Sequence, residues 1–334
     1  MANTGKGKVC VTGASGFIAS WFVKRLLESG YHVLGTVRDP GNHKKVGHLW
    51  NLEGAKERLE LVRADLLEDG SFDDVVMACE GVFHTATPIL TNSNSKDEML
   101  NSAINGTMNV LRACKKNPQL KRVVLTSSSS TVRIKSEADL PPDALLDETS
   151  WSSIEFCESL QIWYAVAKIL AEKAAWEFAR ENKIDLVTVI PTFVVGPNLS
   201  PDLGPTASDV LGLLQGATEK FTVYGRMGYV HIDDVASCHI LAYETPGAEG
   251  RYICNSAVVN NNDLVAMLAA RFPYPVPKSF CNIYGEQTYD FNTSKARALG
   301  LEFKGVEEMF DDAVDSLRGH GHLPKSEIMP RTLI

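Results

Sequence analysis

Hydrophobic residues along the chain follow two spacings in turn, and this alternation predicts strands and helices. Short β-branched runs such as KVCVTG (8–13) and YHVLGTVR (31–38) are typical of buried strands. Between them, FIASWFVKRLLESG (17–30) has apolar positions at helical spacing and ends on a glycine. Further strand-like runs follow, mostly with helical stretches between them: LELVRADL (59–66), GVFHTAT (81–87), KRVVLTSSSS (121–130) and DLVTVIPTFVVG (185–196). The pattern predicts an α/β fold, a Rossmann-type doubly wound parallel sheet covered by helices on both faces.

After the last of these runs the alternation stops. PNLSPDLGPTAS (197–208) is rich in Pro, Gly and Ser, which is typical of irregular structure. The later segments, including GRYICN (250–255) and VEEMFDDAVDSLRGHG (306–321), predict a smaller C-terminal α/β lobe. The domain boundaries that we expect are a Rossmann domain over 1–195 and mainly a substrate-binding lobe over 196–334, with about 226–244 returning to the Rossmann domain.

Composition narrows the function classes. The 334 residues are 44% hydrophobic and 22% charged, close to the soluble average, so a sizeable core can form. A formal net charge of −8 argues against a protein that coats nucleic acid, although it does not exclude a nucleotide ligand. The N-terminus has no secretory apolar segment, and no run approaches the roughly 18 apolar residues of a membrane span. Seven scattered cysteines without a C-x-x-C pair indicate reduced thiols, so we expect a cytoplasmic protein.

A glycine-rich turn directly follows the first strand and opens the first helix. In VTGASGFIAS (11–20), Gly13, Gly16 and Ala19 have the spacing G-x-x-G-x-x-A. The first glycine permits a tight turn, the second lets a phosphate approach the backbone, and the small third residue allows close packing. A pyrophosphate would then lie at the helix N-terminus. The residues that we expect to contact a dinucleotide here are Gly13, Ser15, Gly16, Phe17 and Ile18.

The end of the second strand distinguishes NADP from NAD. A basic residue there pairs with the 2′-phosphate of NADP, whereas an acidic residue accepts from the ribose hydroxyl of NAD. The chain has Arg38 at this position, followed by Lys44 and Lys45, which favours NADP. Asp39 keeps the NAD interpretation open, because a shift of one residue would place its carboxylate at the critical point. A solvated basic turn is the remaining alternative.

Two other strand ends should lie on the same sheet edge. Asp65, followed by Leu66, ends the third strand, where a carboxylate could accept from the adenine amino group. Thr85, Ala86 and Thr87 end the fourth, where small side chains would let the backbone lie against the cofactor. Either segment could equally be an ordinary turn.

A tyrosine and a lysine lie four residues apart within LQIWYAVAKILAEKAAWEFA (160–179). Positions i and i+4 share a helix face, so Tyr164 and Lys168 would be neighbours. Taken alone, this pair would be read as the edge of a core-facing helix. Upstream, VVLTSSSS (123–130) ends a strand beside the expected nucleotide crevice and supplies hydroxyl groups.

Together these motifs resemble the extended short-chain dehydrogenase/reductase superfamily over nearly the whole chain. The resemblance implies that Ser128, Tyr164 and Lys168 carry the reaction, with Tyr164 and Lys168 also contacting the cofactor. It implies that PTFVVG (191–196) lies beside the carboxamide of the nicotinamide. The contacts expected from that segment are Pro191 and Val194.

The chemistry of carbonyl reduction requires these residue types. As hydride reaches the carbonyl carbon, negative charge grows on the oxygen, and Tyr164 can donate the proton that neutralises it. A phenol has a pKa of about 10, so lowering it towards 7 requires roughly 4 kcal/mol of anion stabilisation. We expect the Lys168 ammonium and the nicotinamide charge to provide it, and Ser128 to orient the carbonyl oxygen.

Within the superfamily the chain resembles a plant branch that contains dihydroflavonol reductases, cinnamoyl-CoA reductases and tetraketide α-pyrone reductases. QIWYAVAK (161–168) departs from the NWYCYGK signature of the second group, and Arg133 replaces an asparagine that grips the flavonoid in the first. ASDVLGLLQGATEKF (207–221) and GYVHIDDVA (228–236) are most similar to the third group. This implies NADPH-dependent reduction of a side-chain ketone on a polyketide α-pyrone, towards sporopollenin in the pollen exine.

A 4-hydroxy-2-pyrone is largely anionic near neutral pH, so Arg133 could pair with its oxygen; a solvent-facing loop arginine is the alternative.

A nucleotide-sugar epimerase or dehydratase is disfavoured by Arg38 and by TSSSSTVRIK (126–135), which contains no acidic pair. A non-catalytic NADP-binding regulator typically lacks the tyrosine or the lysine, and this function is disfavoured because Tyr164 and Lys168 are both present. A metal enzyme would have to use His231, Asp233, Asp234 and His239, of which the two aspartates are more simply helix caps.

Overall fold

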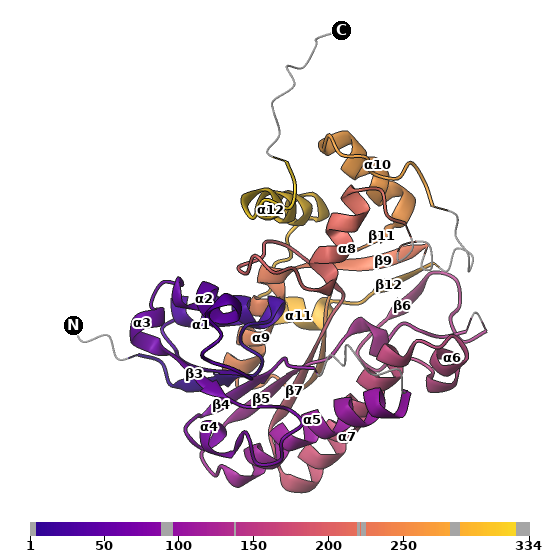
Figure 1. The fold of residues 1–334 in the computed structure, drawn as a ribbon. Coiled ribbons are helices and arrows are strands. Elements are labelled where there is room, and N and C mark those ends of the chain that lie inside the picture. Colours follow the sequence, from indigo (N-terminus) through magenta and orange to yellow (C-terminus); the bar gives the residue numbers. More distant parts are fainter. Residues whose placement is uncertain are drawn as a thin grey trace.

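A parallel sheet forms the centre of the molecule (Figure 1). The computed structural model describes residues 5–87, 96–136, 138–218, 221, 225–280 and 288–324. Within them the large sheet has seven strands, in the order β10-β7-β5-β4-β1-β2-β3. Their bounds are β10 (Gly250–Cys254), β7 (Leu186–Pro191), β5 (Arg122–Thr126), β4 (Gly81–His84), β1 (Lys8–Val11), β2 (His32–Val37) and β3 (Leu59–Arg63). Every pairing in this sheet is parallel, so the predicted α/β fold class is confirmed.

The strand order reverses between β1 and β4. Chain order runs outwards from β1 through β2 to β3, and in the other direction from β4 through β5 to β7. Crossover connections therefore leave the carboxyl ends of β1 and β4 open between two diverging sets of helices. Ligands of doubly wound sheets bind at this switch point.

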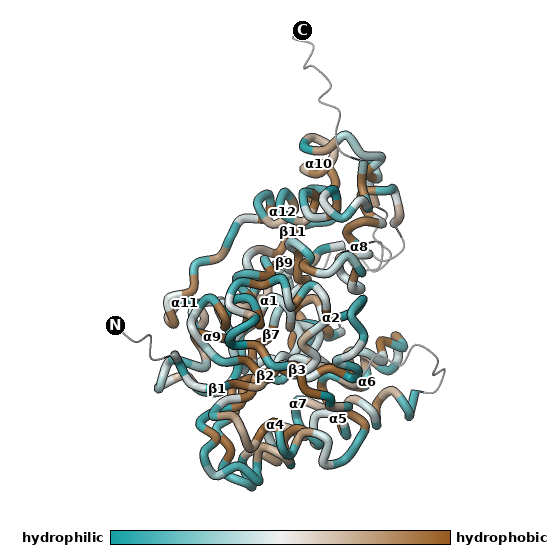
Figure 2. The backbone as a smooth tube through the Cα atoms, turned by 60° about the vertical axis from the view of Figure 1, so that its left-hand side comes forward, coloured by the Kyte–Doolittle hydropathy of each residue, from teal (hydrophilic) through white to brown (hydrophobic). Residues whose placement is uncertain are grey.

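Helices cover both faces of the large sheet (Figure 1). One face carries α1 (Phe17–Glu28), α2 (His43–Trp50) and α9 (Ile232–Glu244), with α1 packed against α9. The other carries α4 (Asp73–Met77), α5 (Lys96–Lys116) and α7 (Trp163–Asn182), with α5 packed along α7. The strands between these layers are buried on both sides, which explains their nearly continuous apolar sequences. Figure 2 shows hydrophobic residues concentrated along these central strands.

A smaller region lies beyond the carboxyl ends of the strands. It contains a three-stranded sheet of β8 (Phe193–Val195), β9 (Arg226–His231) and β11 (Ala257–Asn260), and a two-stranded sheet of β6 (Ala144–Leu146) and β12 (Tyr289–Phe291). Its hydrophobic cluster includes Tyr229, Leu264 and Phe310. The helices of this region are α8 (Pro205–Leu214), α10 (Asn261–Arg271) and α12 (Val306–Gly319). The short elements elsewhere are α3 (Ala55–Arg58), η1 (Ser129–Thr131), α6 (Ile154–Ser159) and α11 (Ser294–Ala298).

Two segments differ from their predicted placement. GRYICN, expected in the C-terminal lobe, forms the edge strand β10 of the large sheet, because its backbone pairs with β7. DLVTVIPTFVVG, expected as one strand, divides at Thr192 into β7 and β8. Pro191 has no N–H to donate, and the β5–β7 ladder ends at Val189. Residues 226–244 divide as well, since β9 lies in the small sheet while α9 packs on the large one. A domain boundary at residue 195 stays a prediction.

Membrane and thiol features are simple in the described part of the chain. None of its helices is both long enough and apolar enough to cross a bilayer. Its cysteines are all buried free thiols. Cys281 lies outside the described residues.

Candidate active site

The glycine turn between β1 and α1 is shaped for close approach of a ligand to the backbone. Gly13 has φ +67°, a conformation that favours glycine, and a Cβ there would lie 3.0 Å from the Cβ of Ala86. Gly16 is the N-cap of α1 with extended backbone and no side-chain cap. In α1, which is described in full, the first turn contains no acidic residue. The N–H groups that open this helix therefore suit an anion such as a pyrophosphate.

Thr12 joins the ends of β1 and β4, a role that the motif analysis missed. Its Oγ1 accepts from the backbone N–H of Thr85 (3.1 Å) and of Ala86 (3.0 Å), and Thr85 Oγ1 donates to the Thr12 carbonyl (2.8 Å). These bonds hold the half-buried segment Thr85–Thr87 against the glycine turn. The position of Thr12 directly before Gly13 could have drawn attention to it. Its partners, however, are 73 and 74 residues away in the sequence, so only the folded chain identifies them.

His84 is the buried end of this connection. Its Nδ1 lies 2.9 Å from Thr12 Oγ1. Because Thr12 Oγ1 already accepts two N–H groups, its own proton is directed towards that nitrogen. Burial lowers the pKa of His84 to about 3, and the nearby Lys168 charge acts in the same direction. His84 is therefore a neutral structural group at physiological pH.

The basic segment after β2 is exposed. Arg38 directly follows the strand, and Lys45 lies in the first turn of α2, which is capped by Asn42. Asp39, the residue that kept the NAD interpretation open, accepts the N–H of Gly41 through its Oδ1 (3.0 Å). The Asp39 carboxylate therefore caps its own turn, and Arg38 occupies the position directly after the strand.

The residues after β3 serve their own turn. Asp65 Oδ1 accepts from the N–H of Leu67 (3.0 Å), and the N–H of Asp65 donates to Ser71 Oγ (2.8 Å). The Leu66 carbonyl accepts from Asn109 Nδ2 on α5 (2.8 Å). The turn interpretation of Asp65 thus has a structural basis, and its contact with adenine stays a prediction.

The predicted carboxamide segment lies at the start of the smaller region. Pro191 ends β7, and Val194, on β8, is buried in the main core. Val194 and Phe17 line one small cavity, so β8 lies beside the first residue of α1. The structure thus brings two distant predicted cofactor contacts together.

Ser128 and Tyr164 are neighbours in the structure. Ser128 follows β5 as the N-cap of η1, where its Oγ accepts from the N–H of Ser130 (3.2 Å). Tyr164 lies in the first turn of α7 and is 53% exposed, although neighbouring protein groups partly desolvate its hydroxyl. This desolvation raises the pKa of Tyr164, and a side-chain hydrogen bond with Ser128 partly offsets it. The structure describes all four consecutive serines, 127–130. Three of them are buried, and Ser128 is the one that is partly exposed.

Lys168 lies one turn further along α7 and is 9% exposed. Its Nζ donates to the carbonyl oxygen of Thr126, at the end of β5 (2.9 Å). Burial lowers the pKa of Lys168 to about 8, while the Glu172 carboxylate acts in the opposite direction. In the coenzyme-free chain the Lys168 ammonium donates to the sheet, and the effect that opposes the raised pKa of Tyr164 comes from Ser128. Stabilisation of the Tyr164 anion by Lys168 stays a prediction.

Arg133 faces the smaller region rather than open solvent. It follows η1, is half-buried, and hydrogen-bonds with the side chain of Tyr289 on β12. Its charge also acts on Tyr229 of β9 and on Cys157. A cation thus stands where the large sheet and the smaller region meet, just beyond the serine segment.

The four residues of the metal hypothesis have separate partners. His231, rather than either aspartate, is the N-cap of α9, since its Nδ1 accepts the N–H of Asp233 (3.0 Å). Asp234 accepts a backbone N–H, and His239 lies 2.8 Å from Thr126 Oγ1. Within the described ranges, no three His, Cys, Asp or Glu side chains converge as a metal site would require. The expected caps at Asp233 and Asp234 are wrong, because both lie inside the first turn.

With this geometry established, comparison with known proteins assigns the chain. The model of the NAD dependent epimerase/dehydratase family matches residues 9–255, well over half of the sequence. The chain belongs to this family. The glycine turn and the Tyr164–Lys168 pair both lie within the matched residues.

Two curated relatives and one solved structure narrow this position within the epimerase/dehydratase family. Tetraketide alpha-pyrone reductase 1 of Arabidopsis thaliana is 62% identical over 97% of this chain and 99% of that protein. The bifunctional dihydroflavonol 4-reductase/flavanone 4-reductase of Malus domestica is 44% identical over 95% and 92%. Yeast methylglyoxal/isovaleraldehyde reductase Gre2, solved with NADPH, has a TM-score of 0.81 at 27% identity, covering 95% and 100%. The chain is therefore an oxidoreductase of the reductase branch, and the predicted resemblance is confirmed.

Proposed function

We propose that the chain reduces the side-chain ketone of a tetraketide α-pyrone to an alcohol with NADPH, in the cytoplasm, as a step in making sporopollenin for the pollen exine. The proposed substrate is supported by sequence identity. The chain is 62% identical to a tetraketide α-pyrone reductase along nearly the full length of both chains, and 44% identical to a bifunctional dihydroflavonol reductase. The buried free cysteines suit a reducing compartment.

The cofactor is NADPH, and the chain offers a matching site. The open N-terminus of α1 at Gly16 would hold the pyrophosphate, and Arg38 with Lys45 would hold the 2′-phosphate. When bound, the coenzyme supplies hydride to the carbonyl carbon.

Tyr164 is the proposed proton donor to the carbonyl oxygen. Its raised pKa keeps the phenol protonated throughout the neutral range, which a donor requires. Ser128, which hydrogen-bonds Tyr164 in the coenzyme-free chain, would direct its single hydroxyl proton to the same carbonyl oxygen and orient it. Lys168 carries its charge below a pKa of about 8 and would stabilise the phenolate that remains.

Arg133 is proposed to select the anionic pyrone. Its interactions with Tyr289 and Tyr229 support a position at the junction with the smaller region. Ser128, the hydrogen-bond partner of Tyr164, lies five residues before it in the chain. A guanidinium there favours an enolate over a neutral carbonyl compound.

Replacement of Arg133 by alanine should therefore be substrate-selective. Loss of a charged hydrogen bond predicts that kcat/KM for an alkyl pyrone falls by roughly tenfold to a hundredfold. For a neutral aldehyde it should change little. Both substrates are measured with one preparation, and Arg133→Lys should retain part of the preference. Equal losses on the two substrates would refute the pairing.

Replacement of Arg38 by serine should weaken the binding of NADPH and leave the binding of NADH unchanged. Loss of the guanidinium beside a phosphate monoester predicts a rise in the Kd for NADPH of roughly tenfold, smaller at high salt because the site is exposed. Binding is followed by coenzyme fluorescence. Lys121→Ser, at an exposed lysine on the opposite end of the sheet, is the matched control and should change neither Kd. An equal loss of NADH affinity would show that Arg38 does not contact the 2′-phosphate.

The decisive test of the substrate is a panel assay. NADPH oxidation is followed with alkyl α-pyrones of several chain lengths, a dihydroflavonol and cinnamoyl-CoA. The proposal expects the highest kcat/KM with a pyrone. Preference for the dihydroflavonol or for the thioester would replace it with the flavonoid or phenylpropanoid alternative.

A further inference from the structure

Glu172 shares one face of α7 with the two proposed catalytic residues of that helix. It follows Lys168 by four positions and Tyr164 by eight, so the three side chains recur at successive turns. Its side chain is 1% exposed. A carboxylate so enclosed must be paired and hydrogen-bonded to be tolerated. The groups that contact it therefore show which segments of the chain it links.

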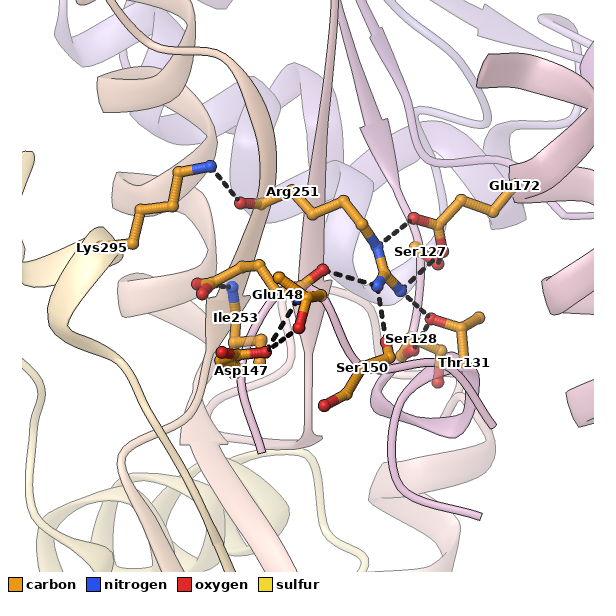
Figure 3. Close-up of polar contacts among 11 residues, drawn as sticks. Ser127, Ser128, Thr131, Asp147, Glu148, Ser150, Glu172, Arg251, Ile253 and Lys295 are labelled. Carbon is orange, nitrogen blue, oxygen red and sulfur yellow. Dashed lines mark hydrogen bonds and ion pairs between the residues drawn. The ribbon is translucent and has the colours of Figure 1, made fainter. Parts of the chain in front are cut away.

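Two groups meet the Glu172 carboxylate from different elements (Figure 3). Arg251 on β10 donates from Nε to Oε1 at 2.8 Å, and its own side chain is only 8% exposed. Ser127 donates from Oγ to Oε2 at 2.5 Å. The pair therefore links the edge strand, α7 and the segment that follows β5.

The Arg251 guanidinium is fixed in orientation by further contacts. Its Nη1 donates to the carbonyl oxygens of Glu148 (2.9 Å) and Ser150 (2.7 Å), and its plane lies over the ring of Trp151 at 3.9 Å from the centroid. An arginine held by several acceptors and a stacked ring has one rotamer available. Figure 3 shows these carbonyls and Glu172 converging on the guanidinium from separate segments.

The same guanidinium also reaches the backbone of Ser128. Its Nη2 donates to Thr131 Oγ1 (2.9 Å), and the Thr131 hydroxyl donates to the Ser128 carbonyl oxygen (2.9 Å). Ser127 is tied through Glu172 and Ser128 through Thr131, so both residues depend on one ion pair.

We propose that the buried Arg251–Glu172 pair is a positioning device for reduction. It holds the Ser127–Ser128 segment against α7 so that the Ser128 and Tyr164 hydroxyl groups meet on one carbonyl oxygen. This inference rests on the proposed function. Arg251 and Glu172 do not touch substrate; they act through Ser127, Thr131 and the backbone between them.

Arg122 provides a matched control for the loss of a buried arginine. It lies at the amino end of β5, its side chain is also 8% exposed, and it pairs with Asp185 (2.9 Å). Its Nη1 donates to the carbonyl oxygens of Ala242 (2.7 Å) and Thr245 (2.8 Å). These contacts are of the same kind as those of Arg251, but they stand at the opposite end of the strand from Ser128.

The test compares Arg251→Met, Thr131→Val and Arg122→Met in the full chain. Each is titrated with NADPH to count competent sites and melted to measure stability. Then kcat is measured per competent site, with NADPH and with NADPH deuterated at nicotinamide C4. Misplacement of a catalytic hydroxyl predicts that kcat falls by roughly tenfold to a hundredfold in the first two variants. Their KM for NADPH should change little, and the deuterium effect on kcat should rise because the chemical step becomes slower.

Arg122→Met should lower the melting temperature and leave kcat per site unchanged. Arg251→Lys, which keeps the charge but not the planar fork, should recover part of the lost kcat. If Arg251→Met does not fold, Thr131→Val decides, because it leaves the ion pair in place. Unchanged kcat in Thr131→Val, or an equal loss in Arg122→Met, would overturn the proposal. A wild-type chain that reduces no carbonyl with NADPH would instead overturn the proposed function.

Discussion

Tyr164→Phe is expected to lower kcat by roughly 10²- to 10⁴-fold, the range for removal of a positioned general acid. Phenylalanine keeps the ring and removes only the proton donor. Affinity for NADPH should therefore stay close to that of the wild type. Both quantities come from one experiment, in which coenzyme binding is titrated by fluorescence and turnover is followed by NADPH oxidation.

The control for this change is Tyr31→Phe. Tyr31 is a buried tyrosine whose hydroxyl donates to Glu244 Oε1 (2.8 Å) away from the site, so this variant loses a hydroxyl without losing the proposed donor. It should lose some stability and no turnover per folded molecule. If Tyr164→Phe turned over at the wild-type rate, another group would have to supply the proton.

Lys168→Met is expected to separate activity from stability. Loss of the cation predicts a fall in kcat of roughly a hundredfold, since the phenolate left after proton transfer is no longer stabilised. The KM for NADPH should rise as well, because Lys168 is also an expected contact of the cofactor. Burial already disfavours the charged lysine, so the melting temperature should not fall with activity. Lys173→Met, at an exposed lysine of the same helix, should keep full activity. A melting temperature that falls in parallel with activity would point to a structural role.

The pH profile gives an independent readout of Lys168. Its pKa of about 8 in the coenzyme-free chain means that the ammonium is present below that pH and is lost as pH rises through it. We therefore expect kcat/KM for NADPH, which reports the free enzyme, to fall above about pH 8. Lys168→Met should lack this limb. A profile that stays flat to pH 10 in the wild type would contradict the role of the charge.

The sequence by itself determined the features whose causes are local. The positive φ of Gly13 and the open N-terminus of α1 depend on a few consecutive residues, so the G-x-x-G-x-x-A spacing located the turn correctly. The helical repeat places Lys168 one turn after Tyr164 in any fold. Strands buried on both faces have continuous apolar sequences, which is why the parallel sheet was recognised from pattern alone.

Only the tertiary structure decided which distant segments meet. GRYICN has the same apolar sequence whichever sheet it joins, and its pairing with β7 is what brings Arg251 to Glu172, a partner 79 residues away in the sequence. The raised pKa of Tyr164 and the lowered pKa of Lys168 depend on how much protein surrounds each group, which spacing along a helix does not report. Periodicity and turn chemistry act within a few residues, whereas burial, strand pairing and buried ion pairs arise only when the chain has folded upon itself.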